Sequence, residues 1–388
     1  MKIETVASDL TDTARALEAV AEAARGADFV FAAANADHPA AQVQAGLSAL
    51  GIGALHGASS CRGAMSAAGH STKAGLTLFV LRDAAGDYGT GRAAFGADGA
   101  RGAAQRATEA ALAACAREGE VPDVLWVTAT PGAEEAVLQG IEDTIGTAAP
   151  IIGGSAADNA VAGAWYVLDG QGTCGDGVVV TAMFPSVPVS YAYQNGYAPT
   201  GQAGRVTRAD GRRMIEIDGA PAFDVLQEWS GGALPSPAAD ADANILSAAT
   251  LWPLGRSAEA VQGIPTYLLA HPATADASGA VTLFADVAEG EAITQMTGTT
   301  EALAARAGRV AAQAMPRSGA VAGALMVYCG GCMLSLRDKL DVVTGGTAEA
   351  LGGAPFLGFF SFGEQGPMAG SGNRHGNLMI SCLVFGAS

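Results

Sequence analysis

Cys329 and Cys332 stand three positions apart, where an apolar stretch of the sequence gives way to an amphipathic one. This spacing suits a redox pair, half of a tetrahedral zinc site, or two small residues in the wall of a pocket. Cys332 is predicted at the start of a helix, where free N–H groups favour a thiolate, and Cys329 is then the natural resolving thiol. A second pair of cysteines or histidines is missing, so a zinc site would need His375, Cys61 or Glu364 to complete it in space. The sequence leaves these alternatives open.

A second group of polar residues follows the next apolar run. Glu364 comes after Gly363 at the end of a predicted strand, and His375 and Asn377 precede the strand after it. A hairpin would return these side chains close to Glu364, with Arg374 beside them to hold a carboxylate. Glu364 itself would bind an ammonium group, or act as a general base if its pKa were raised.

The N-terminal half offers a matching set of small and acidic residues. They also follow predicted strands, and they are Ser59, Ser60, Gly154, Ser155 and Asp158. Small residues at such positions let a ligand approach backbone N–H groups. Together with Cys329, Cys332, Glu364, His375 and Asn377, they form the predicted ligand-binding site.

The elements that would position these residues recur three times. Each unit is an apolar strand, a short loop, an amphipathic helix and a second strand that ends in glycine and small polar residues, and the copies cover residues 28–63, 122–159 and 323–367. Strand–helix–strand units favour parallel neighbours, and the loops after parallel strands meet at one edge of a sheet. We therefore predict an α/β protein of two related domains, residues 1–218 and 219–388, with mixed β-sheets built from these units.

Composition limits the classes of partner. The 388 residues include 49% hydrophobic and 15% charged ones, with a net charge of −17 and a pI near 4.6. A surface this acidic repels phosphate backbones and anionic lipid, so neither nucleic acid nor a membrane is an expected partner. No apolar run is long enough for a membrane span and the first residues lack a signal core, so we expect a cytoplasmic protein whose six cysteines form no disulfide framework.

Several stretches resemble the FIST family, whose members carry a FIST N-terminal domain and a FIST C-domain. The N-terminal resemblance is in residues 150–159, 165–170 and 176–184, and the C-terminal one is in residues 324–332, 355–367 and 375–381. The resemblance implies a cytoplasmic sensory module of bacterial signal transduction that binds small molecules such as amino acids. It also implies output through a separate signalling protein. The sequence departs from the family where Cys332 stands close to the place of a basic residue.

The sequence therefore predicts a sensory protein that binds a small polar metabolite. The alternative is a thiol- or metal-dependent enzyme that uses Cys329 and Cys332 with Glu364 or His375 as acid and base, and the balance is against an enzyme. No cofactor is expected, with zinc and haem as minor alternatives. Some FIST proteins are associated with haem, for which a histidine such as His56 or His70 would be the axial ligand.

Overall fold

Three copies of one chain pattern build most of the protein. The computed structural model describes residues 1–71, 73–238, 241–261, 264–317 and 319–387. The first copy contains β1 (Lys2–Ser8), α1 (Thr13–Ala24), β2 (Phe29–Asn35), α2 (Ala40–Ser48), β3 (Ala54–Ser60), β4 (Ala64–Ser66), β5 (Gly69–His70) and β6 (Leu76–Arg82). The second contains β7 (Asp87–Ala94), α3 (Gly99–Ala114), β8 (Val124–Ala129), α4 (Glu134–Ile145), β9 (Ile151–Ser155), β10 (Val167–Asp169), β11 (Gly172–Cys174) and β12 (Gly177–Phe184).

The third copy follows the same order, with a long insertion after its first strand. It contains β13 (Val189–Asn195), α7 (Thr300–Ala314), β23 (Val321–Cys329), α8 (Gly330–Ser335), η1 (Arg337–Lys339), α9 (Leu340–Ala350), β24 (Phe356–Ser361), β25 (Glu364–Met368), β26 (Gly372–Gly376) and β27 (Met379–Gly386). The mixed α/β class and the three strand–helix–strand units are confirmed.

The local sequence explains these elements. All seven residues of β2 are buried, as expected for an apolar strand covered on both faces. The side chain of Asp12 caps α1 by accepting the N–H of Arg15, and Thr299 caps α7 by accepting the N–H of Ala302. The helices then bury alanine-rich stripes against the sheets.

Each copy forms one mixed sheet, and a hairpin from another copy completes it. The strand orders of the three six-stranded sheets are β1-β6-β2-β3-β10-β11, β7-β12-β8-β9-β25-β26 and β13-β27-β23-β24-β4-β5. The second copy thus lends β10–β11 to the first sheet, the third copy lends β25–β26 to the second, and the first copy lends β4–β5 to the third. The exchange runs in a closed cycle, so the three copies are one folding unit.

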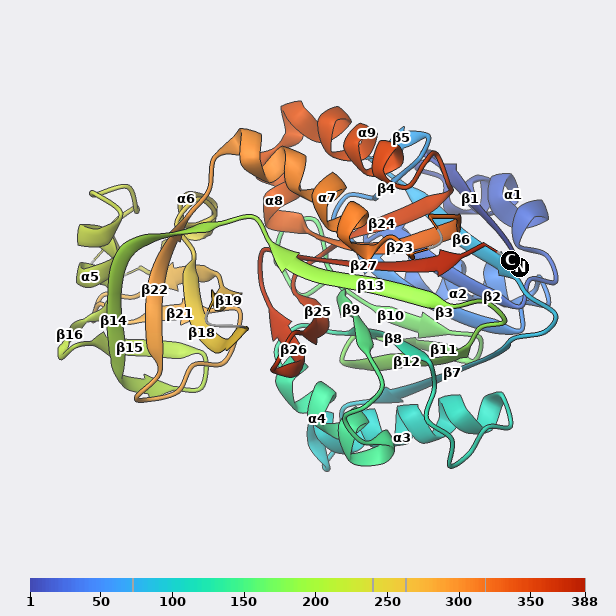
Figure 1. Cartoon of the computed structure of the whole chain (residues 1–388), viewed down its shortest axis with the longest axis horizontal. Coiled ribbons are helices and arrows are strands. Elements are labelled where there is room, and N and C mark those ends of the chain that lie inside the picture. The colour runs from blue at the N-terminus through green and yellow to red at the C-terminus, as the bar shows by residue number, and fades with distance from the viewer. Residues whose placement is uncertain (72, 239–240, 262–263, 318, 388) are drawn as a thin grey trace.

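The inner faces of the three sheets share one hydrophobic core. Phe31 of the first sheet lies with its ring centroid 5.1 Å from that of Trp126 in the second and 5.5 Å from that of Phe359 in the third, in edge-to-face contact. The outer faces carry helices: α1 and α2 on the first sheet, α3 and α4 on the second, and α7 and α9 on the third. Figure 1 shows the helices around the three sheets, with both chain termini side by side at one end.

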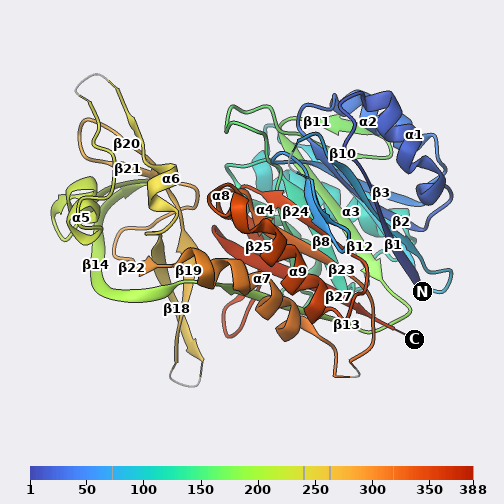
Figure 2. The same ribbon diagram turned by 90° about the horizontal axis from the view of Figure 1, so that it is seen from above.

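The insertion projects from the opposite end of this core (Figures 1 and 2). It consists of β14 (Ala198–Asp210), β15 (Arg213–Ile217), β16 (Ala220–Pro221), α5 (Ala222–Trp229), β17 (Ala243–Asn244), α6 (Leu246–Ala249), β18 (Leu254–Val261), β19 (Ile264–Ala270), β20 (Pro272–Ala275), β21 (Val281–Leu283) and β22 (Ala292–Thr297). We call these residues, 198–297, the insert, and the rest of the chain the core. Ala198 pairs with Thr297 where β14 leaves and β22 returns, so two adjacent strands join the insert to the core.

The division predicted near residue 218 lies inside the insert, in the turn between β15 and β16. Strands from both sides of this position pair in the second and third sheets, as β9 with β25 and β24 with β4 do. The two predicted domains stay a prediction, and they do not coincide with the three copies. No helix within the described residues has the length and apolarity that crossing a membrane requires.

Candidate functional site

The carboxyl ends of the parallel strand pairs carry related residues in the three copies. Ser60 lies opposite Asn35, Ser155 opposite Ala129, and Ser361 opposite Cys329. Hydrogen bonds from backbone N–H groups join these strand ends across the copies. The N–H of Phe360 donates to Ser60 Oγ at 2.9 Å, and the N–H of Ser155 donates to the carbonyl of Gly363 at 2.7 Å. The predicted convergence of these loops is present.

Four of the predicted site residues serve the fold at this end. Ser59 Oγ accepts the N–H of Tyr166, and Ser60 Oγ donates to the carbonyl of Gly63. Asp158 accepts three backbone N–H groups, from residues 160, 162 and 164. Burial alone would raise the pKa of Asp158, but these hydrogen bonds hold it below its ordinary value. A Cβ on Gly154 would lie 2.5 Å from Val327 Cγ1, so packing requires glycine there. Their role in ligand binding stays a prediction.

Glu364 is fully buried and engaged within the protein. Its Oε1 lies 2.6 Å from Ser361 Oγ, and its Oε2 accepts the N–H of Met379 at 2.9 Å. Burial, and then the nearby Cys329, raise the pKa of this carboxyl well above its ordinary value. The Glu364 carboxyl therefore holds its proton to higher pH than a free glutamate does, which makes it a poorer anchor for an ammonium group.

The two cysteines lie in the same interior. Cys329 is the N-cap of α8 and Cys332 lies in its first turn, each 5 or 6% exposed. The hydrogen bond with Cys332 and burial together raise the pKa of Cys329 well above its ordinary value. The thiol of Cys329, the predicted resolving partner, thus keeps its proton. The thiolate predicted at Cys332 stays a prediction.

Cys329 lines a small apolar cavity of about 40 Å³ between core and insert. Its other lining residues are Val161, Leu246, His271, Phe284, Gly331, Leu334, Phe362 and Asn377. Asn377 fastens the insert here, because its Oδ1 accepts the N–H of His271 at 3.1 Å and its N–H donates to Leu269. Burial lowers the pKa of His271 to about 4, so this imidazole stays neutral.

A buried polar cluster lies beside Ser155, and most of its residues are not part of the predicted site. Glu134, 1% exposed at the start of α4, accepts the hydroxyl of Ser155 at 2.7 Å and Nη2 of Arg212 at 2.7 Å. Glu135 accepts the same Nη2 at 2.9 Å. Burial alone would raise the pKa of Glu134, but His375 and Arg212 together hold it below its ordinary value.

His375 and Gln365 continue this cluster from the hairpin β25–β26. Gln365 Nε2 lies 3.2 Å from His375 Nδ1, and the other ring nitrogen of His375 lies 3.3 Å from the carbonyl of Phe284 in the insert. Gln365 Nε2 also lies 3.4 Å from Ser155 Oγ, so two of the predicted site residues, Ser155 and His375, meet at Gln365. Their role in ligand binding stays a prediction. Glu134 and Glu135 follow a strand end as the predicted residues do, whereas nothing in the sequence indicates that Arg212 docks there.

The cluster is also the place where donor atoms for a metal gather. Ligand atoms of Glu134, Glu135 and His375 lie within 4.8 Å of one another, the only such group of histidine, cysteine and acidic residues in the described ranges. The guanidinium of Arg212 bonds both carboxylates and supplies the positive charge there. Neither Cys329 nor Cys332 belongs to this group. The two cysteines therefore do not fit the zinc site that the sequence suggests as an alternative.

The side chain of His56, which the haem alternative uses as an axial ligand, is buried inside the core. Its Nδ1 lies 2.9 Å from Thr181 Oγ1 and its Nε2 lies 2.9 Å from Thr128 Oγ1. Complete burial lowers the pKa of His56 to about 3. Both ring nitrogens are thus used by the fold, and His56 does not fit an axial ligand.

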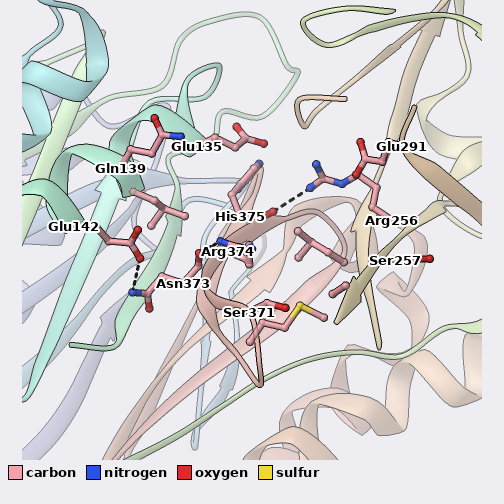
Figure 3. Close-up of a pocket in the computed structure, with 14 residues that line it drawn as sticks. Glu135, Gln139, Glu142, Arg256, Ser257, Glu291, Ser371, Asn373, Arg374 and His375 are labelled. Atoms are coloured by element: carbon pink, nitrogen blue, oxygen red, sulfur yellow. Dashed lines mark hydrogen bonds between the residues drawn. The ribbon is translucent and has the colours of Figure 1, made fainter. Parts of the chain in front are cut away.

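An open cleft of about 390 Å³ lies between α4, the hairpin β25–β26 and the insert (Figure 3). Its charged and polar lining residues are Glu135, Gln139, Glu142, Arg256, Ser257, Glu291, Ser371, Asn373, Arg374 and His375. Arg256 bonds the carbonyls of Asp286 and His375, which places its guanidinium between insert and core. Both signs of charge therefore line one hollow of the size that small ligands occupy.

Family models match almost the whole chain. The FIST N domain matches residues 28–220 and the FIST C domain matches residues 222–367. The chain belongs to the FIST family, whose domains are associated with sensing in signal transduction and with the binding of small ligands. The suspected family is thus confirmed.

Other comparisons add little. No curated protein matches the chain. Among solved structures, it is similar to a cyanuric acid hydrolase from A. caulinodans, at 12% identity and a TM-score of 0.35, over 100% of this chain and 99% of that one. A likeness this weak carries no argument about function.

Proposed function

We propose that this protein is a sensor that binds a small zwitterionic molecule, such as an amino acid, in the cleft between core and insert. The observation that carries the proposal is the mixed charge of the cleft. Arg256 and Arg374 line it together with Glu135, Glu142 and Glu291. Guanidinium groups bind carboxylates through paired N–H donors, and carboxylates bind ammonium groups. A zwitterion satisfies both kinds of group at once.

Arg374 is the best candidate for the carboxylate anchor. Its side chain is exposed at the cleft, and its Nη1 bonds the carbonyl of Asn373, so other N–H donors remain for a ligand. Glu291 and Arg256 belong to the insert, whereas Arg374 and Glu142 belong to the core (Figure 3). A bound molecule would therefore bridge the two parts of the chain.

The ammonium anchor in this proposal differs from the one that the sequence indicates. Glu364 is buried, its pKa is raised, and it does not line the cleft. Glu291, Glu135 and Glu142 are partly exposed carboxylates of the cleft, and Glu135 and Glu142 already bond Arg212 and Asn373. Glu291 bonds no side chain of the described residues, and its Oε2 accepts the N–H of Ala288 at 3.2 Å, so its Oε1 is the oxygen we assign to the ammonium group.

The test is a thermal-shift panel of free amino acids, followed by calorimetric titration of any hit. Arg374→Ala and Glu291→Ala should each weaken binding at least about tenfold, because each removes a charge-assisted hydrogen bond. Arg15→Ala is the matched control, since Arg15 is exposed on α1, outside the cleft lining. A hit whose affinity is the same in all three variants would contradict the assignment to this cleft.

A further inference from the structure

A long groove runs along β13 and shares one lining residue, Met368, with the cleft. It consists of two adjoining hollows of about 460 and 530 Å³, which share Tyr193, Gln194, Met368 and Ala369. We call it the β13 groove, and its floor is the run of residues 191–197. Leu268 of β19 lines the cleft while its neighbour Tyr267 lines the groove, so β19 stands between the two.

The floor of the groove is a sheet edge. β13 is the terminal strand of the third sheet and pairs with β27 alone. Successive residues from Tyr191 to Tyr197 line the hollows, as expected where the backbone itself faces the groove. An edge strand with an open backbone is a template for the addition of another strand.

The walls are a helix on one side and turns on the other. Ala302, Arg306, Arg309 and Gln313 line the groove from one stripe of α7, at helical spacing. Residues 367–369, at the end of β25 and the start of the turn after it, and residues 265–267 of β19 face them. Figure 1 shows β13 at the front of the core, with α7 above it and the hairpin β25–β26 below.

The charge of the helical wall is unbalanced. In a chain of net charge −17, neither Arg306 nor Arg309 forms an ion pair with any described residue. The side chain of Arg306 has a buried Nε without a partner, and its Nη2 reaches Gln194 only at 3.5 Å. Burial and the neighbouring Arg309 lower the pKa of Arg306, as expected for a cation that lacks an anion.

The rest of the lining is aromatic and apolar. Tyr193, Tyr197, Tyr267, Pro199, Pro265, Met368 and Met379 form it, and Tyr191 is 43% exposed at the far end. Tyrosine and methionine are enriched where proteins bind partner chains. A strand alternates its side chains between two faces, so carboxylates can face α7 while apolar side chains face the tyrosines.

We propose that the β13 groove is the docking site for an extended acidic segment of a partner protein, which adds a strand to the free edge of β13. At roughly 3.3 Å per residue, the floor accommodates a segment of about seven residues. Backbone pairing supplies the affinity, and Arg306 with Arg309 selects for carboxylates. The groove would then provide the output that a sensory protein needs.

The test uses the full chain and a fluorescent synthetic peptide of about seven residues in which Glu and Val alternate. Fluorescence anisotropy should show binding that weakens with added salt. The Arg306→Glu, Arg309→Glu variant should lose at least about tenfold in affinity and gain affinity for the peptide with Lys in place of Glu. An Arg15→Glu, Arg25→Glu variant changes the net charge equally, on α1 and at its C-cap, and should bind as the unaltered protein does.

A second peptide isolates the backbone contribution. Methylation of every backbone amide nitrogen keeps the charge and removes the N–H donors on both edges of the peptide, so this peptide should not bind. Equal binding of the methylated peptide would show that charge alone is recognised and would overturn the proposal. So would failure of the acidic peptide to bind, or sedimentation that shows a dimer abolished by Arg306→Glu, Arg309→Glu, since a second copy would then occupy the groove.

Discussion

Glu134 and Glu364 are both almost fully buried carboxylates, yet their surroundings shift the pKa in opposite directions. Glu134 lies against Arg212 and His375, and this attraction exceeds the cost of burial. Burial and the neighbouring Cys329 raise the pKa of Glu364, and the hydrogen bonds from Ser361 and Met379 do not offset them. The surroundings of Glu134 therefore favour the anion that holds the insert, whereas those of Glu364 favour the neutral acid.

The substitution Glu364→Gln tests the raised pKa of Glu364. The Ser361 hydroxyl donates to Glu364, and it can turn to accept from the amide N–H of Gln while the amide oxygen accepts the N–H of Met379. We therefore expect a change in unfolding free energy below about 1 kcal/mol at pH 7. Glu364→Ala leaves both partners unsatisfied and should cost about 2–3 kcal/mol. Urea denaturation measures both.

The dependence of this effect on pH has a definite sign. A raised pKa means that the unfolded chain ionises first, so the contribution of Glu364 to stability falls as pH rises above the unfolded value near 4.5. Between pH 4 and pH 7, Glu364→Gln should therefore gain stability relative to the unaltered protein, because the glutamine side chain does not ionise. A constant difference over that range would contradict a raised pKa.

Thiol labelling tests the state of the cysteines. Burial raises the pKa of Cys61 and Cys382 to about 12, and Cys329 is shifted upward as well. Iodoacetamide at pH 7.5 should therefore label Cys115 and Cys174, which are partly exposed, well before these three. Mass spectrometry of tryptic peptides locates the labels. First labelling at Cys329 would restore the thiol-dependent enzyme as the leading alternative.

At the scale of elements, contacts between α4 and the turn of β14 and β15 hold the insert on the core. Arg212 bonds Glu134 and Glu135 of α4 and Asp286 of the insert, and the N–H of Asp286 donates to Glu135. The insert is joined to the core by two strands, so these contacts decide how firmly it docks.

Removal of Arg212 should release the insert. Arg212→Met leaves the buried Glu134 without its cationic partner and should reduce stability by about 3 kcal/mol. Hydrogen exchange should also become faster in residues 198–297. Arg213→Met is the matched control, because Arg213 pairs with Asp276 inside the insert at a half-exposed site and should cost less than about 1 kcal/mol. Equal effects of the two substitutions would contradict a specific docking role for Arg212.

Acid should have the same effect as Arg212→Met. The pKa of Glu134 is lowered in the folded state, so its stabilising contribution is present above the unfolded value near 4.5 and is lost as pH falls through the folded value.

The sequence predicts many elements of the core, but it predicts little of how the insert packs against the core. Strand ends followed by small residues indicate Ser155, Ser361 and Cys329 at one edge, where the structure has them. The same rule applied to the end of β8 would have included Glu134 and Glu135. Arg212 and Arg256 come from the insert, and sequence patterns do not show which surface a distant segment will meet.

At the scale of the whole molecule, the cyclic exchange of hairpins makes the core one unit. Periodicity predicts the three copies, because it reports local burial. It does not predict which copy lends a hairpin to which sheet, since that depends on pairing between residues as distant as Phe359 and Ala64. The predicted division at residue 218 follows sequence resemblance and not this pairing.

The exchange predicts the behaviour of fragments. Residues 1–218 lack β25–β26 for the second sheet, and residues 219–388 lack β4–β5 and β13 for the third. Neither fragment should show cooperative thermal unfolding alone, whereas the two coexpressed should copurify. The N-terminal fragment folding by itself to a stable state would contradict the single-unit core.

The central claim is that a small zwitterion binds between core and insert. The most direct measurement is hydrogen–deuterium exchange by mass spectrometry, with and without the strongest hit of the amino-acid panel. We predict slower exchange in α4, β18 and β26, the elements that supply Glu142, Arg256 and Arg374 to the cleft, and no change along β13. Protection confined to any other part of the core, with α4, β18 and β26 unaffected, would contradict the claim.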